Sequence, residues 1–257
     1  MLSTIIKYGK KILMVLIIGV LLTTNIGYAQ DNNYIKWNVG NSIEVSQMQQ
    51  RECQVVIRIG EYEGKPGKRV YLEDVGLYFK DIPIDIKLHR DNRGTYVHEY
   101  DLNKKIATKL YNELINNGIN AKLQDTKDKT EDLNNAGRIA NESNAKIYLS
   151  IHTNYYDNNS EGFFIMSNKG DAQARLIADR LSSSIENNGM IKRRNALLNE
   201  GRIGEMNKIN NRTIALLFEA GFYSNPNELK KLMSDEYSNY IAMHLTSELV
   251  KILNEIK

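Results

Sequence analysis

Four side chains could together support metal-assisted hydrolysis: His89, Glu99, His152 and Glu219. His89 and His152 each close a short apolar run, and Glu99 opens the amphipathic stretch that follows His89. Two neutral imidazoles and one carboxylate are a recurring ligand set for catalytic zinc, and they leave one position open for water. A zinc ion held in this way polarises a carbonyl group and makes water more acidic.

Glu219 follows the nearly all-apolar run Thr213–Phe218. A carboxylate after a buried strand costs free energy unless it has a partner or a task. Beside a metal, it can take a proton from water and pass that proton to a leaving nitrogen. The structural alternative for this residue is an ion pair or a helix cap. We predict that Glu219 is a general acid/base.

The elements that must position these residues alternate between strands and helices. Leucines and isoleucines at every fourth position after Glu99 indicate an amphipathic helix that ends at Asn117-Gly118. Short apolar runs elsewhere are typical of buried strands. The sequence predicts strands over residues 82–88, 119–124, 147–151, 162–166 and 213–218, and helices that begin near residues 99, 130, 171, 228 and 237.

This alternation predicts an α/β fold, with a mostly parallel, doubly wound sheet that has helices on both faces. In such a sheet the carboxyl ends of the strands and the amino ends of the following helices lie on the same edge. Side chains that are distant in sequence, such as Glu99 and His152, would therefore converge there.

Residues 1–29 have the pattern of a secretory signal peptide: three lysines, an apolar run over Ile12–Leu22, and small residues at Gly27 and Ala29. The apolar run is shorter than the roughly 20 residues that a spanning helix needs. We predict a protein that is secreted or held in the cell envelope and has no stable membrane insertion after cleavage. An uncleaved N-terminal anchor is the alternative.

Composition narrows the class of partner. The formal net charge of +3 falls to zero without the leader, which carries three lysines and no acidic residue. A neutral chain argues against nucleic acid or an anionic membrane surface as the main partner. Cys53 is the single cysteine, so an exported chain has no internal disulfide. We expect a monomer.

Residues 30–81 are predicted to form an N-terminal arm and a β-rich extension. Residues 30–50 are polar, and strands are expected over Gln54–Gly60 and Val70–Phe79. The Gly64-Lys65-Pro66-Gly67 stretch between these strands is a turn signal.

Several blocks of the sequence resemble those of zinc-dependent N-acetylmuramoyl-L-alanine amidases. The blocks are Arg138–Asn141, the Ser-Ile-His-Thr-Asn segment within Ile147–Asn154, the Glu-Ala-Gly-Phe-Tyr-Ser-Asn segment within Leu216–Asn225, and the helix start Glu99–Asn103. The resemblance covers about residues 82–256 and implies that residues 82–257 form the catalytic domain. It implies a single zinc ion and hydrolysis of the amide between the lactyl group of muramic acid and L-alanine in peptidoglycan. It makes Glu99 and His152 zinc ligands and Glu219 the acid/base.

The first ligand departs from the family pattern, which places a histidine in a Gly-His-Gly-Gly turn after the first strand. In one alignment His89 replaces that histidine. In the other, Val55–Gly60 is the first strand, Glu61 takes the place of the histidine, and an insertion precedes Glu99. His89 is the preferred residue because it keeps the chemistry. The missing turn also motivates an alternative function, a catalytically impaired amidase-fold protein that binds or regulates at the cell wall.

Overall fold

The computed structural model describes residues 52–61, 64–78, 86–125, 136–168, 170–186, 191–194 and 204–256. The predicted leader, the polar arm at 30–50 and the helix start near Thr130 lie outside these residues. The main compact unit begins at Glu52.

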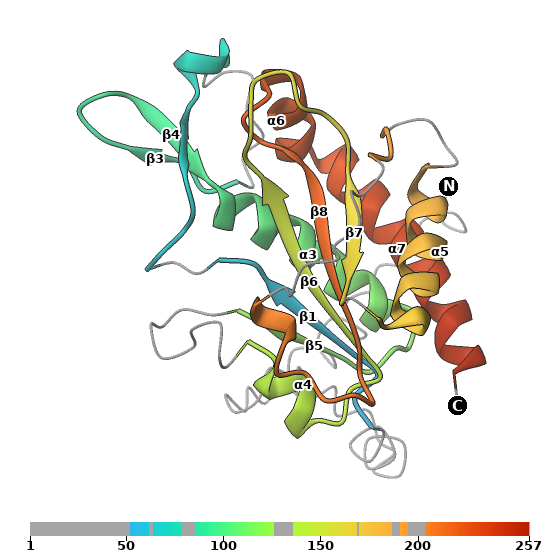
Figure 1. Ribbon diagram of the computed structural model, residues 1–257. Helices are drawn as coiled ribbons and strands as arrows, with labels where there is room; N and C mark the ends of the chain where they lie inside the picture. Colours follow the sequence, from blue (N-terminus) through green and yellow to red (C-terminus); the bar gives the residue numbers. More distant parts are fainter. Residues whose placement is uncertain are drawn as a thin grey trace, which may run out of the picture. The chain divides into compact units, whose positions relative to one another are not determined.

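A five-stranded sheet forms the centre of this unit, with the strand order β5-β1-β6-β8-β7 (Figure 1). Four of the strands run parallel, and only β7 is antiparallel to its neighbour β8. The predicted α/β class with a mostly parallel sheet is therefore confirmed. The strands are β1 (Val55–Ile59), β5 (Ala121–Gln124), β6 (Ile147–Asn154), β7 (Phe164–Ser167) and β8 (Ile214–Phe222).

The position of β1 corrects the predicted extension. Residues Val55–Ile59 are all buried and pair in parallel with both β5 and β6. An uninterrupted apolar run is what a strand covered on both faces requires. The main sheet therefore includes β1, although the sequence pattern predicts this strand as part of the N-terminal extension. A boundary at residue 82 does not separate the extension from the main sheet.

Helices cover both faces of the sheet (Figure 1). One face packs against the large core, to which Ile57, Leu149 and Leu216 contribute. The opposite face packs Val56, Tyr148 and other residues into a smaller core. The large core includes buried residues of α3 (Glu99–Asn116), α5 (Ala172–Glu186), α6 (Pro226–Met233) and α7 (Asp235–Glu255), and the small core includes residues of α4 (Arg138–Glu142) and the 3-10 turn η3 (Gly204–Met206).

Helix α3 sets the position of Glu99, its first residue. Asp101 accepts a hydrogen bond from the backbone N–H of His98, at 3.1 Å, and so fixes the chain where the helix begins. Leu102, Ile106 and Leu110 are fully buried and hold the helix against the sheet. Glu99 therefore lies on a rigid element.

A second, three-stranded antiparallel sheet has the order β2-β4-β3. Its strands are β2 (Arg69–Tyr71), β3 (His89–Arg90) and β4 (Thr95–His98). The strand predicted over Val70–Phe79 ends early, because Glu73–Val75 form a 3-10 turn (η1) that ends at Gly76, with φ +68°. The predicted strand at 82–88 falls mostly outside the described residues. Within the described part of the chain, no helix combines the length and apolar character needed to cross a membrane.

The central place of β1 predicts the effect of shortening one of its side chains. Ile57→Ala should lower the free energy of unfolding by about 2–5 kcal/mol, because it opens a cavity in the main core. Leu176→Ala is the matched control, since Leu176 on α5 is 61% exposed and its loss should change stability by less than about 0.5 kcal/mol. Chemical denaturation measures both. Equal effects would contradict the placement of β1.

Candidate metal centre

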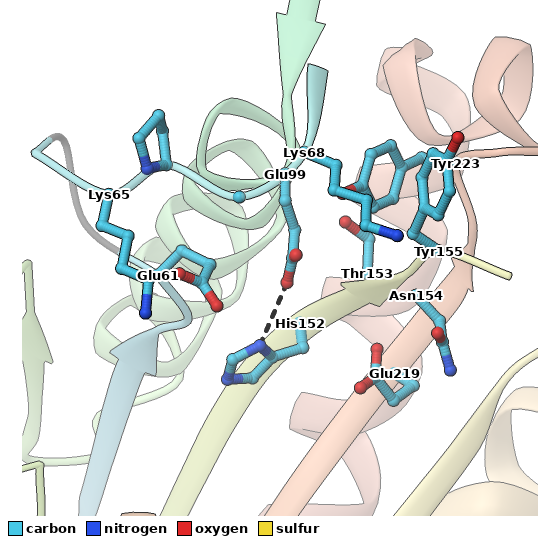
Figure 2. Close-up of a pocket in the computed structure, with 12 residues that line it drawn as sticks. Glu61, Lys65, Lys68, Glu99, His152, Thr153, Asn154, Tyr155, Glu219 and Tyr223 are labelled. Atoms are coloured by element: carbon cyan, nitrogen blue, oxygen red, sulfur yellow. Dashed lines mark hydrogen bonds and ion pairs between the residues drawn. The ribbon is translucent and has the colours of Figure 1, made fainter. Parts of the chain in front are cut away.

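Four segments bring acidic and imidazole side chains to one edge of the main sheet (Figure 2). Glu61 follows β1, Glu99 begins α3, and His152 and Glu219 lie near the carboxyl ends of β6 and β8. His152 and Glu219 are register partners on these adjacent strands, just before the register between β6 and β8 shifts. All four line a cavity of about 520 Å³. The predicted convergence of Glu99, His152 and Glu219 is therefore present in the structure.

Three of these residues form a cluster that fits a metal ion. Glu61, Glu99 and His152 each offer one ligand atom, and these atoms all lie within 4.8 Å of one another. The Nδ1 atom of His152 is 3.1 Å from Oε1 of Glu99. Two carboxylate oxygens and one imidazole nitrogen are all donors that zinc accepts. The donor set therefore fits a divalent cation.

The backbone around Glu61 is unusual. Glu61 has φ +60°, a left-handed conformation that few residues other than glycine adopt. Such a conformation costs roughly 1–3 kcal/mol and tends to occur at functional sites. Burial raises the pKa of Glu61, and the nearby charge of Glu99 raises it further. A positive ion between these two carboxylates would relieve that repulsion.

Two glycines allow the backbone to approach the cluster closely. A Cβ atom on Gly60 would lie 2.5 Å from atoms of the His152 ring. A Cβ atom on Gly67, which has φ +84°, would lie 2.7 Å from Cβ of Glu99. The end of β1 can therefore approach β6, and the loop at Gly67 can approach the start of α3, because these two positions lack side chains.

The other ring nitrogen of His152 faces a residue that the sequence did not reveal. Nε2 lies 3.3 Å from Oε2 of Glu205, which is only 3% exposed. Burial alone would lower the pKa of His152, but the charge of Glu205 and hydrogen bonds to Glu205 and Glu99 raise it well above its usual value. Glu205 also pairs with the buried Arg58. His152 is thus in contact with a carboxylate on each side of its ring.

Glu219 lies in a buried environment that shifts its pKa. Its Oε2 atom is buried and has no hydrogen-bond partner among the described residues. Burial raises the pKa of Glu219 to about 7; His152 opposes this shift, and the charges of Glu99 and Glu205 add to it. A carboxyl group with a pKa near neutrality can both accept and release a proton.

The structure does not bring His89 to this cluster. His89 lies on β3 of the small sheet, with Nε2 2.9 Å from Oδ2 of Asp101 and its ring against Tyr96 and His98. It lines a separate cavity of about 460 Å³. The reason is topological: β1, not the segment before His89, is the strand beside β6. Of the two positions weighed for the first ligand, the structure therefore brings Glu61 to the cluster and leaves the preferred residue, His89, outside it.

Comparisons with known proteins agree with this fold. The sequence pattern of the N-acetylmuramoyl-L-alanine amidase family (Amidase_3) matches residues 84–250, well over half of the chain. No curated protein matches the chain in sequence.

Solved amidase structures are similar to the chain at low sequence identity. An N-acetylmuramoyl-L-alanine amidase from Clostridium difficile 630 is 21% identical, with a TM-score of 0.60 over 80% of this chain and 100% of that one. AmiC2 of Nostoc punctiforme is 22% identical, with a TM-score of 0.59 over 79% and 98%. The catalytic domain of CwlV from Bacillus (Paenibacillus) polymyxa var. colistinus is 18% identical, with a TM-score of 0.58 over 78% and 97%.

The close approach at Gly60 predicts a selective effect on metal binding. Gly60→Ala should destabilise the protein by about 1–3 kcal/mol and weaken binding of a divalent metal, because the new methyl group displaces the His152 ring. Gly137→Ala is the control: its Cβ would lie 2.5 Å from Cγ1 of Ile209, away from the cluster. Thermal unfolding and metal titration measure both effects. Gly60→Ala with undiminished metal affinity would contradict the geometry.

Proposed function

The chain belongs to the N-acetylmuramoyl-L-alanine amidase family, and from this premise we propose that it hydrolyses peptidoglycan with a zinc ion held by Glu61, Glu99 and His152. The bond cleaved is the amide between the lactyl group of N-acetylmuramic acid and L-alanine. The main support for this proposal is that the three candidate ligands and Glu219 line the same cavity.

The charge of the ligand set bears on the choice of metal. Two carboxylates bring two negative charges, so a divalent ion would leave the centre neutral. A set of two neutral histidines and one carboxylate would leave one positive charge. Carboxylates are harder ligands than imidazole and also suit manganese. We propose zinc because imidazole suits it and because zinc accepts all three donors of this cluster.

Bound zinc would polarise the amide carbonyl and make water more acidic. Glu219 accepts the proton that the attacking water loses as its oxygen bonds to the carbonyl carbon. Glu219 then delivers this proton to the amide nitrogen as the carbon–nitrogen bond breaks. The products are the lactyl carboxylic acid and a peptide with a free amino group on L-alanine. A carboxyl group with a pKa of about 7 suits both transfers.

The cavity wall offers contacts for the rest of the substrate. Tyr155 and Tyr223 stack edge to face with ring centroids 5.4 Å apart, and Nζ of Lys68 lies 4.2 Å from the centre of the Tyr155 ring. Aromatic rings bury apolar faces of a ligand, and a lysine can pair with a carboxylate. We propose that Lys68 and Tyr155 hold the muramyl group and its peptide stem, and that the buried Tyr223 supports the Tyr155 ring.

Export precedes this activity in our proposal. Residues 1–29 direct secretion, and the mature chain acts in the cell envelope as a monomer. The substrate lies outside the cytoplasm, and the charge-neutral mature chain has no need of an anionic surface.

One observation favours a second candidate, a wall-binding or regulatory protein with an impaired centre. The cluster of Glu61, Glu99 and His152 has a single imidazole, whereas the family pattern supplies a histidine as the first ligand. The amidase would hydrolyse peptidoglycan, whereas the wall-binding or regulatory protein would bind it without turnover.

Metal content distinguishes the two possible first ligands. Glu61→Ala should lose bound zinc, because only two ligands remain at the cluster. His89→Ala should keep it, because His89 lies in the other cavity. Equilibrium dialysis with metal analysis measures both, and circular dichroism shows that each variant is folded. Zinc lost from His89→Ala and kept by Glu61→Ala would reverse the assignment.

Turnover tests the reaction itself. The exported chain should release labelled stem peptides from peptidoglycan and create new amino-terminal L-alanine without new reducing sugar ends. Glu219→Gln should keep zinc and lose about 10²–10⁴-fold in rate, because it removes the group that transfers the proton. Zinc binding without release by the unmodified chain would support the wall-binding alternative. Full activity of Glu219→Gln would contradict its role.

A further inference from the structure

His152 has a partner at each ring nitrogen. Nδ1 lies 3.1 Å from Glu99, on the side of the cluster, and Nε2 lies 3.3 Å from Glu205. Figure 2 shows the Nδ1 side of the ring pointing toward Glu99. An imidazole offers a metal only one nitrogen, and the other nitrogen then carries a proton that needs an acceptor. Glu205 lies where that acceptor would be.

Packing fixes the position of Glu205. It is the middle residue of η3, and its neighbour Met206 is 1% exposed in the small core with Val56 and Tyr148. Asn168 also donates a hydrogen bond to the backbone carbonyl of Met206, at 3.3 Å. The turn is therefore held against the sheet face opposite α3, and its carboxylate reaches His152 from that face.

Arg58 supplies the compensating charge. Its guanidinium is buried on β1, pairs with Oε2 of Glu205 and donates a hydrogen bond to Oγ of Ser150, at 3.3 Å. A buried carboxylate is costly unless it is paired and hydrogen-bonded. Arg58 therefore allows an ionised Glu205 to lie beneath the histidine.

We propose that Glu205, held by Arg58, is a positioning residue for His152: it accepts the Nε2–H hydrogen bond and so directs the Nδ1 lone pair toward the metal. This inference rests on the metal centre of the proposed function. A carboxylate on the outer nitrogen fixes the tautomer and orientation of a ligand histidine and raises its basicity. The effect matters here because His152 is the single imidazole of the cluster.

Zinc affinity tests the role of Glu205. Glu205→Gln should weaken zinc binding by about 10–100-fold in competition with a chromophoric chelator. Glu228→Gln is the matched control: Glu228 is also buried, but it binds the backbone of Gly162 at 2.9 Å and Lys231 at 3.2 Å. Its zinc affinity should equal that of the unmodified chain. Zinc affinity of Glu205→Gln within twofold of the unmodified chain would overturn the proposal.

A second variant controls for the possibility that Glu205→Gln weakens zinc binding by disturbing the fold. In the double variant Arg58→Leu with Glu205→Leu both buried charges are absent, a change that proteins often tolerate. It should remain folded, with zinc affinity as low as that of Glu205→Gln. Zinc affinity equal to that of the unmodified chain would overturn the proposal.

Nitrogen NMR of the His152 ring gives a readout that a structural role would not change. The zinc-loaded chain should show a protonated Nε2 and a metal-bound Nδ1, and Glu205→Gln should shift the Nε2–H signal upfield. Zinc bound through Nε2 would overturn the proposal. A chain that binds zinc as described but releases no stem peptide would contradict only the proposed function.

Discussion

The balance of charge around His152 is the constraint on which the site depends. Four carboxylates surround this ring, and each shifts the pKa of His152 or of another carboxylate of the group. They belong to Glu61, Glu99, Glu205 and Glu219. Like charges at this spacing in a partly buried place repel strongly. Arg58 neutralises one carboxylate, and burial raises the pKa of Glu219 to about 7. Glu61 and Glu99 remain, and a divalent cation bound by both and by His152 would complete the balance.

The parallel sheet arranges these charges through its register. Arg58 on β1 is the register partner of Ser150 on β6, which accepts its hydrogen bond. Two residues further along β6, His152 is the partner of Glu219 on β8. The buried ion pair thus lies below the ring and the candidate metal cluster lies at the sheet edge. Glycine at position 60 allows β1 to pass close enough to His152 for Glu61 to join the cluster.

Sequence patterns predicted those residues of the candidate site that lie at the ends of strands or at the start of a helix. Glu99, His152 and Glu219 each lie where an apolar run or a helix marks the sheet edge, and parallel strands bring such edges together. The choice between Glu61 and His89 could not be made in this way. The runs 54–60 and 82–88 both have strand character, and only pairing with β6 decides which one enters the sheet.

Glu205 had no signal in the sequence. It lies on a three-residue turn, 53 positions from the histidine that it contacts, and a turn of that length has no periodicity to recognise. Arg58 likewise lies in the middle of an apolar strand. The role of a buried charge there cannot be predicted until its partner is known. Interactions of this kind depend on tertiary packing, which brings together segments that local patterns describe one at a time.

A crystal structure of the zinc-soaked protein, with anomalous scattering recorded at the zinc edge, would locate the bound metal. We expect one strong anomalous peak in contact with the carboxylates of Glu61 and Glu99 and with Nδ1 of His152. A peak against His89 and Asp101 instead, or no peak at the cluster at saturating zinc, would contradict it.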